Sequence, residues 1–263
     1  MLRPRVIPCL LVHRGGLVKT IEFGSPKYIG DPINAVRIFN EKEADELMVL
    51  DIDATVQRRE PDFSLIKRLA AECRMPICYG GGVTTVDHVV RLVNLGVEKV
   101  AMSSAAVRTP DILGKMASAV GGQSIVVVID VRRRTSFSGP RYDLCSHNGT
   151  IVYDLNPVDY AKMIQEFGVG EIVVNSIDRD GKMDGYDLEL AEKFRTAVRV
   201  PLTFLGGAGS FNHMNKIVNL IGNVGCAAGS LFVFKGKYKA VLINYPTVEQ
   251  RMEIFNNVKK ISK

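Results

Sequence analysis

The chain has 263 residues, which is long enough for one large domain or two smaller ones. Hydrophobic residues make up 46% of it and charged residues 24%, as in soluble globular proteins and unlike disordered chains. No apolar run approaches the roughly 20 residues of a membrane span, and no signal-peptide pattern follows the first residues. We therefore expect a cytoplasmic protein with no membrane partner.

The function classes that remain possible are limited by the number and spacing of the cysteines and histidines and by the net charge. The five cysteines are odd in number and contain no C-x-x-C pair, which favours a reducing compartment. The four histidines lack the spacing of metal ligands, so we expect no metal and no cofactor. The net charge of +6 suits an anionic substrate or nucleic acid. Because the basic residues are spread out and lack interleaved aromatic residues, we expect solvated surface charge and no nucleic-acid partner.

Short β-branched segments alternate with longer amphipathic segments, which is typical of consecutive βα units in a parallel sheet. The predicted strands are residues 6–12, 47–51, 77–79, 99–103, 124–130, 172–175, 202–205 and 226–228. The predicted helices include residues 62–73, 84–95, 110–120, 156–167, 188–197, 210–221 and 248–261, several of which begin with an N-cap residue. The long segment 13–32 after the first strand is a candidate loop acting as a lid.

The two halves of the chain resemble each other. Residues 46–53 (ELMVLDID) resemble residues 171–178 (EIVVNSID), which lie 125 positions later, and residues 75–82 resemble 200–207 at the same offset. Eight βα units with such a duplication predict a single (β/α)8 barrel over residues 1–263, with half-barrels at about 1–122 and 123–263. A doubly wound open sheet is the alternative, although the glycines lack the G-x-G-x-x-G spacing of a dinucleotide site.

Glycine and serine residues end four of the predicted strands. Active residues of a (β/α)8 barrel lie at the carboxyl ends of its strands, where glycine lets backbone N–H groups approach an anion and serine adds a donor. The matched positions in the two halves predict two phosphate sites and a substrate with an anionic group at each end; tight turns without a ligand are the alternative. These residues are Gly81, Gly82, Ser103 and Ser104 in the first half and Gly206, Gly207, Gly229 and Ser230 in the second.

Three further positions are candidates for chemistry. Asp130 ends a buried strand, where a carboxylate is costly unless it faces a polar cavity, so it is a candidate general acid or base; pairing with Arg132 or capping a turn is the alternative. Asp180 and Gly181 form a polar turn suited to ligand binding, or an Asx turn alone. Lys19 in the candidate lid is placed to close over a phosphate, or is simply solvated.

Charged residues stand at the starts of four predicted strands, at the face opposite the glycines. Arg5, Glu46, Lys99 and Glu171 carry two charges of each sign and predict a ring across the bottom of the barrel. The ring either plugs the barrel or surrounds an opening. Surface ion pairs contribute about 0–1 kcal/mol each, so stability alone is a weak reason for such a ring.

These features resemble the cyclase subunit (HisF) family of imidazole glycerol phosphate synthase, a duplicated (β/α)8 barrel of histidine biosynthesis, over nearly the whole chain. The motifs that carry the resemblance are RPRVIPC (3–9), VK (18–19), GDP (30–32), LDI (50–52), GGG (80–82), AAV (105–107), EI (171–172), SIDRDG (176–181) and GGAG (206–209).

The resemblance implies a heterodimer with a HisH-like glutaminase subunit. Ammonia released there passes through the barrel to a doubly phosphorylated ribulosyl intermediate, which yields imidazole glycerol phosphate and an aminoimidazole carboxamide ribotide. It further implies that Asp130 is one of two catalytic carboxylates, and that Lys19 lies on the mobile substrate loop. The family's ammonia gate corresponds to Arg5, Glu46, Lys99 and Glu171.

The chain departs from the family pattern at its catalytic positions. Leu11 stands where the resemblance places the second catalytic aspartate, Leu205 replaces a serine, and Ser103-Ser104 replaces an Asn-Thr pair. Loss of an acid–base group costs on the order of 10²–10⁴ in rate. An intact gate beside altered chemistry resembles the divergent paralogues associated with surface-polysaccharide genes. There the barrel and its glutaminase supply ammonia to a separate enzyme that amidates a sugar.

We therefore expect an ammonia-conducting, glutaminase-activating barrel with weak or absent cyclase activity. Its expected partners are a glutaminase subunit, an anionic small molecule and a sugar amidotransferase. An active cyclase (a lyase of histidine biosynthesis) is one alternative. A purely structural partner of the glutaminase is the other.

Overall fold

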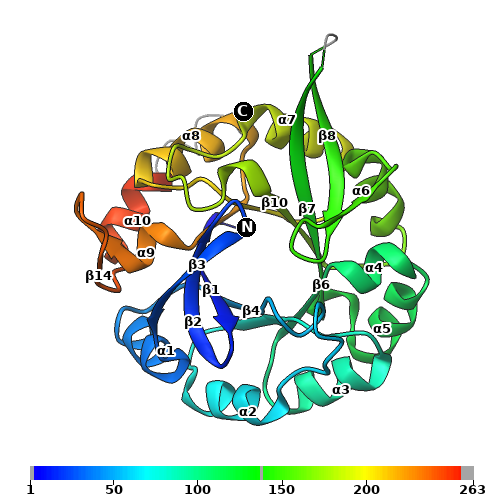
Figure 1. The fold of residues 1–263 in the computed structure, drawn as a ribbon, viewed down its shortest axis with the longest axis horizontal. Helices are drawn as coiled ribbons and strands as arrows, with labels where there is room; N and C mark the ends of the chain where they lie inside the picture. The colour runs from blue at the N-terminus through cyan, green and yellow to red at the C-terminus, as the bar shows by residue number, and fades with distance from the viewer. Residues whose placement is uncertain (1–2, 137–138, 256–263) are drawn as a thin grey trace.

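In the computed structural model, which describes residues 3–136 and 139–255, eight parallel strands close into a barrel with helices around it (Figure 1). Each strand pairs in parallel with the next, and the last pairs with the first. In order around the barrel they are β1 (Arg5–His13), β4 (Leu47–Asp51), β5 (Ile77–Gly80), β6 (Lys99–Met102), β7 (Ile125–Ser136), β10 (Glu171–Ser176), β11 (Leu202–Leu205) and β12 (Gly225–Ala228). The predicted (β/α)8 barrel is confirmed, and the open sheet is wrong.

Several helices of the outer layer begin at a residue whose side chain caps the helix. Asp62 accepts a hydrogen bond from the Leu65 N–H at 2.9 Å, and Asp187 accepts one from the Leu190 N–H at 3.0 Å. The helices are α1 (Pro32–Glu41), α2 (Phe63–Glu72), α3 (Val86–Asn94), α4 (Ser104–Arg108), α5 (Ile112–Val120), α6 (Pro157–Gln165), α7 (Leu188–Ala197), α8 (Phe211–Ile221), α9 (Ser230–Val233) and α10 (Val248–Phe255). Of the predicted helix 248–261, residues 256–261 lie outside the described residues. No helix within the described ranges combines the length and the apolar character needed to cross a membrane.

Two antiparallel excursions extend the barrel at the carboxyl ends of β1 and β7. The segment 13–32, predicted as a loop, instead forms β2 (Gly16–Ile21) and β3 (Gly24–Gly30), because Leu17 and Val18 are buried and pair with the end of β1. Strand β7 continues to Ser136 because it pairs with β8 (Gly139–Ser146), followed by β9 (Ile151–Tyr153). In Figure 1 the green β7–β8 hairpin extends beyond the ring of helices.

The inside of the barrel is apolar between its two ends. We call these inward-facing buried residues the lumen cluster: Ile7, Cys9, Met48, Cys78, Ala101, Val126, Val128, Val173 and Ala227. Three partly buried leucines, Leu11, Leu50 and Leu205, pack against the cluster at the carboxyl ends of β1, β4 and β11. A second, larger cluster fills the space between strands and helices. The described residues of this cluster therefore give the middle of the barrel an apolar lining.

The internal duplication recurs as one backbone contact in each half. Gly81 has a φ of +125°, and a Cβ built on it would lie 2.5 Å from the Asp51 carbonyl oxygen. Gly206 has a φ of +96°, and its Cβ would lie 2.5 Å from the Ser176 oxygen. Both glycines and both carbonyls are separated by the repeat offset of 125 residues. Only glycine satisfies both the backbone conformation and the close approach.

Gly206→Ala tests this contact. We expect it to lower the free energy of unfolding by about 3 kcal/mol, because a left-handed conformation costs about 1–2 kcal/mol and overpacking about 1–3 kcal/mol. Gly96→Ala is the matched control, since Gly96 has a φ of +98° but its Cβ would meet Ala70 only at an ordinary 3.6 Å. Urea denaturation of both variants measures the difference. Equal losses would show that the close approach costs nothing.

Candidate functional site

A pocket lined by both polar and apolar residues lies at the carboxyl end of the barrel, above the lumen. Its lining includes every residue predicted for catalysis or phosphate binding, and these are Leu11, Lys19, Gly81, Gly82, Ser103, Ser104, Asp130, Asp180, Gly181, Gly206, Gly207, Gly229 and Ser230. The strands bring them together because the carboxyl ends of all eight meet at one face. The roles assigned to these residues stay predictions, whereas their common location is a structural fact.

Asp130 lies at the floor of the pocket and is 8% exposed. Its carboxylate accepts hydrogen bonds from Asn175 Nδ2 at 2.9 Å and from Ser103 Oγ at 3.1 Å. Burial raises the pKa of Asp130 to about 6, although both hydrogen bonds oppose the shift. A carboxyl group with this pKa exchanges protons near neutral pH and is suited to acid–base chemistry. In this structure the Ser103 hydroxyl donates to Asp130, and its predicted role in phosphate binding stays a prediction.

Lys19 reaches down from β2 into the wall of the pocket. Its Nζ donates to the backbone carbonyl of Cys9 at 2.5 Å, and the residue is 6% exposed. A Cβ on Gly229 would lie 2.3 Å from this Nζ, so glycine makes room for the amine. Burial lowers the pKa of Lys19 below its ordinary value, and nearby Asp180 only partly offsets this. Lys19 is thus buried rather than solvated.

Asp180 and Gly181 hold the β2–β3 hairpin against the pocket. The Asp180 carboxylate accepts from Thr20 Oγ1 at 2.6 Å and from the Phe23 N–H at 3.1 Å. Gly181 has a φ of +70°, and a Cβ on it would lie 2.1 Å from the Thr20 carbonyl oxygen. In this structure the side chain of Asp180 therefore anchors the hairpin, and any contact with an anion falls to backbone N–H groups.

The carboxylates that line the pocket within the described residues are Asp51, Asp130 and Asp180. Asp51 Oδ1 accepts from the N–H groups of Asp53 and Ala54 at 2.9 and 3.0 Å, so it stabilises its own turn. Asp53 is bonded to His13 Nδ1 and the Arg14 N–H, both at 2.8 Å. Asp51 lines the pocket, its Oδ2 lies 3.6 Å from Arg59, and burial raises its pKa, whereas both oxygens of Asp53 are hydrogen-bonded.

The sequence analysis missed several residues that line the pocket. Asn175 lies two positions beyond inward-facing Val173 on β10, so strand alternation was a usable signal for it. His147 and Asn148 enter from the turn after β8 and carried no such signal. The His147 N–H donates to Ser104 Oγ at 3.4 Å, which connects this turn to a predicted phosphate position.

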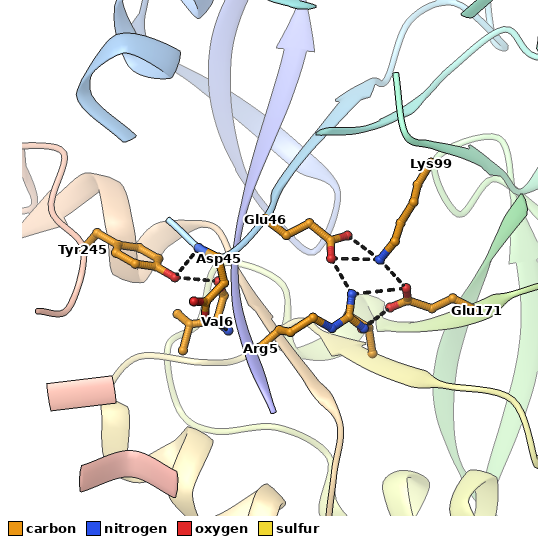
Figure 2. A network of polar contacts seen from close by, with 8 residues as sticks. Arg5, Val6, Asp45, Glu46, Lys99, Glu171 and Tyr245 are labelled. Carbon is orange, nitrogen blue, oxygen red and sulfur yellow. Dashed lines mark hydrogen bonds and ion pairs between the residues drawn. The ribbon is translucent and has the colours of Figure 1, made fainter. Parts of the chain in front are cut away.

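The four charged residues at the amino ends form one closed network, the charged ring (Figure 2). Arg5 contacts both Glu46 and Glu171, the latter at 2.7 Å. Lys99 Nζ lies 2.8 Å from both Glu46 and Glu171. The glutamate side chains are 4% and 5% exposed, whereas those of Arg5 and Lys99 are 25% and 19% exposed. The predicted ring is therefore assembled, with its carboxylates inside and its cations nearer to solvent.

The ring residues stabilise one another's charged forms. Burial alone would lower the pKa of Lys99, but Glu171 and Glu46 raise it above the ordinary value. Burial opposes ionisation of Glu171, yet Arg5 and Lys99 hold its pKa below the usual range. Thr203 Oγ1 also donates to Glu171. Removal of one member would leave an uncompensated charge in the base of the barrel.

Together the fold and these two sites define a (β/α)8 barrel with a glycine-lined pocket at one end and a charged ring at the other. The family described as Histidine biosynthesis protein matches residues 5–239. The chain belongs to the HisF family of these proteins.

Relatives match along nearly the full chain. A Leptospira interrogans protein, provisionally named imidazole glycerol phosphate synthase subunit HisF, is 53% identical over 255 residues, which cover 97% of this chain and 100% of that protein. A Vibrio vulnificus protein, provisionally named subunit hisF3 of that synthase, is 55% identical over 251 residues, covering 95% of this chain and 96% of its own length. A Frankia casuarinae protein, named imidazole glycerol phosphate synthase subunit HisF without qualification, is 38% identical over 230 residues, or 88% of this chain and 90% of that protein.

The raised pKa of Asp130 predicts a pH-dependent stability difference in Asp130→Asn. The carboxyl group titrates near 3.9 in the unfolded chain and at about 6 in the folded chain, so the folded wild type binds more protons between these pH values. The wild type therefore loses stability as pH rises from about 4 to 6, and this loss persists above pH 6. We expect the variant to gain about 2 kcal/mol relative to wild type between pH 4 and pH 7.5. Urea denaturation at both pH values measures this gain. A difference that does not change with pH would contradict the burial argument.

Proposed function

We propose that this chain is an ammonia-handling subunit that receives ammonia from a glutaminase partner at the charged ring and releases it at the carboxyl-end pocket. The family supplies the class of complex, because the relatives are named as synthase subunits. The observation that carries the proposal is the sequence of layers along the barrel axis: charged ring, lumen cluster, then leucines.

An apolar lumen suits ammonia in its neutral form. Ammonia carries no charge, whereas ammonium would lose its hydration without a compensating partner among the lumen residues. The ring supplies polar groups where the molecule leaves water, and the lumen cluster excludes ions beyond it. A purely structural partner has no need of buried charges, since buried ion pairs are weak contributors to stability compared with apolar residues of similar size.

The leucines continue the apolar lining to the floor of the pocket. Leu11 and Leu205, together with Leu50, pack against the lumen cluster and also line the pocket. The family resemblance puts polar groups at two of these positions, and leucine has no proton to exchange at either. Their substitution favours passage of ammonia over its consumption in a cyclase reaction, with Asp130 left as a single acid–base group.

The acceptor we propose is a sugar carboxylate or activated sugar handled by a separate amidating enzyme of surface-polysaccharide synthesis. This rests on the resemblance to divergent paralogues. The relatives with 53% and 55% identity carry provisional or numbered subunit names, whereas a relative named as HisF without qualification is 38% identical. This difference in identity supports a branch apart from the histidine enzymes.

A second candidate is an active cyclase of imidazole glycerol phosphate synthase. Buried Lys19, Asp130 with its pKa of about 6, and the paired glycines all line one pocket, and each favours this candidate. In that case the glycine and serine positions bind the two phosphates of the ribulosyl substrate. Leu11 counts against it, because leucine has no proton to exchange.

Isotope competition tests the ammonia path. The barrel is reconstituted with its glutaminase and the amidating enzyme, then supplied with [amide-¹⁵N]glutamine and an excess of unlabelled ammonium. We expect the amide product to carry mostly ¹⁵N, because ammonia crosses the lumen without mixing with solvent. Dilution of the label to the bulk ratio would leave only a structural role for the barrel.

Leu11→Asp tests the account of the missing cyclase activity. We expect it to raise cyclase turnover with ammonium salt by on the order of 10²-fold, since acid–base groups contribute about 10²–10⁴. Leu11→Asn is the matched control, because it adds a polar group of the same shape without an exchangeable carboxyl proton. Product formation is followed as the carboxamide ribotide. A wild-type rate equal to that of Leu11→Asp would mean that Leu11 does not limit the chemistry.

A further inference from the structure

Tyr245 occupies a buried position beside the charged ring, far along the chain from it. It is 8% exposed, and its hydroxyl donates to the Val6 carbonyl at 2.8 Å and accepts from the Asp45 N–H at 3.0 Å. Val6 directly follows Arg5, and Asp45 directly precedes Glu46. Figure 2 shows this second network next to the ring, with the Tyr245 hydroxyl directed at both Asp45 and Val6. One hydroxyl therefore holds the chain at two ring members.

These contacts replace sheet hydrogen bonds where the β1–β4 ladder ends. The paired register of the two strands begins at Cys9 and Met48, so the chain at Val6 and Asp45 lies beyond it. There the Val6 N–H donates to Asp45 Oδ2 at 3.0 Å, and the Val6 carbonyl accepts from Tyr245. Asp45 also lies 3.6 Å from Arg251. On the β4 side, side chains thus replace backbone hydrogen bonds next to Arg5 and Glu46, whereas on its other side β1 pairs with β12 from Arg5 onward.

The aromatic side chain of Tyr245 packs against neighbours that connect it to the pocket. It packs on Phe232 with centroids 5.5 Å apart, and on Phe39 at 6.3 Å. Phe232 belongs to α9, whose first residue, Ser230, lines the pocket. The segment 242–245 is hydrogen-bonded to the same helix, because the Asn244 N–H donates to the Phe232 carbonyl at 2.8 Å. A continuous packed path therefore joins the pocket to the ring outside the lumen.

We propose that Tyr245 is a positioning residue for the charged ring. Packed against α9, it fixes Val6 and Asp45, and these hold their neighbours Arg5 and Glu46 in register. The contacts stand on their own; the consequence for ammonia entry rests on the proposed function. A displaced Glu46 separates from Lys99, which then loses one of its two carboxylate partners.

The pKa of Lys99, measured in the isolated chain, reports whether the charged ring keeps its geometry. Lysines are ¹³C-methylated and followed by NMR in wild type, in Tyr245→Phe, which keeps the aromatic ring and removes only the hydroxyl, and in Tyr238→Phe. Tyr238 is 84% exposed on the same C-terminal segment and is the matched control. We expect the pKa of Lys99 to fall by about half a unit or more in Tyr245→Phe and to be unchanged in Tyr238→Phe. An unchanged Lys99 titration in folded Tyr245→Phe overturns the proposal.

Variants at Asp45 provide a second test. Asp45→Asn keeps an acceptor for the Val6 N–H, so we expect a Lys99 titration close to wild type; Asp45→Ala removes the acceptor and is expected to lower the Lys99 pKa as Tyr245→Phe does. Equal effects of Asn and Ala contradict the positioning role, because they would point to the lost charge instead.

Glutaminase kinetics separate this inference from the proposed function. In the complex with the glutaminase partner, we expect Tyr245→Phe to lower kcat for glutamine several-fold and to leave KM unchanged, since the ring lies outside the glutamine site. A wild-type barrel that fails to accelerate the glutaminase overturns the proposed function, while the Lys99 titration still decides the role of Tyr245.

Discussion

Two carboxylates buried at the amino end of the barrel impose the main constraint on this structure. Glu46 and Glu171 are almost fully buried, and each is neutralised by both Arg5 and Lys99. Removing such charges from water costs several kcal/mol per ion, and apolar residues of similar size would often stabilise a protein equally well. The ring therefore requires all four members in register, and it restricts what the ends of β1, β4, β6 and β10 can be. A functional reason accounts for its presence better than stability does.

Above the charged ring, the kind of side chain that lines the barrel changes along the barrel axis. The lumen cluster is apolar, and the leucines at positions 11, 50 and 205 carry that character into the pocket. The glycine turns, Lys19 and Asp130 line the same pocket, and Asp130 has a pKa raised to about 6 by burial. The β2–β3 hairpin is held over the pocket by Asp180. The leucines beside Asp130 favour the proposed passage of ammonia, and Asp130 remains the predicted acid–base group.

Much of this arrangement was accessible from the sequence because it follows from periodicity and duplication. The eight strands and most helices follow from local hydrophobic patterns, and the glycines at 81–82 and 206–207 follow from segments that repeat 125 residues apart. The β2–β3 and β7–β8 hairpins escaped prediction because their strands lack alternating burial: β3 is largely exposed, whereas the middle of β2 and the second half of β8 are continuously buried. The roles of Asp51 and Ser103 depend on hydrogen bonds set by the fold. Tyr245 contacts Val6 across 239 positions, and no local signal marks such a partner.

The most direct test of this account measures glutamine hydrolysis and cyclase turnover in the same reaction. The purified barrel is combined with its glutaminase, glutamine and the doubly phosphorylated ribulosyl substrate, and glutamate and carboxamide ribotide are quantified together. We expect the barrel to accelerate glutamate release while no ribotide forms above background, with glutaminase alone as the reference. Ribotide formed in proportion to glutamate would contradict the account and identify a working cyclase in which Leu11 is tolerated.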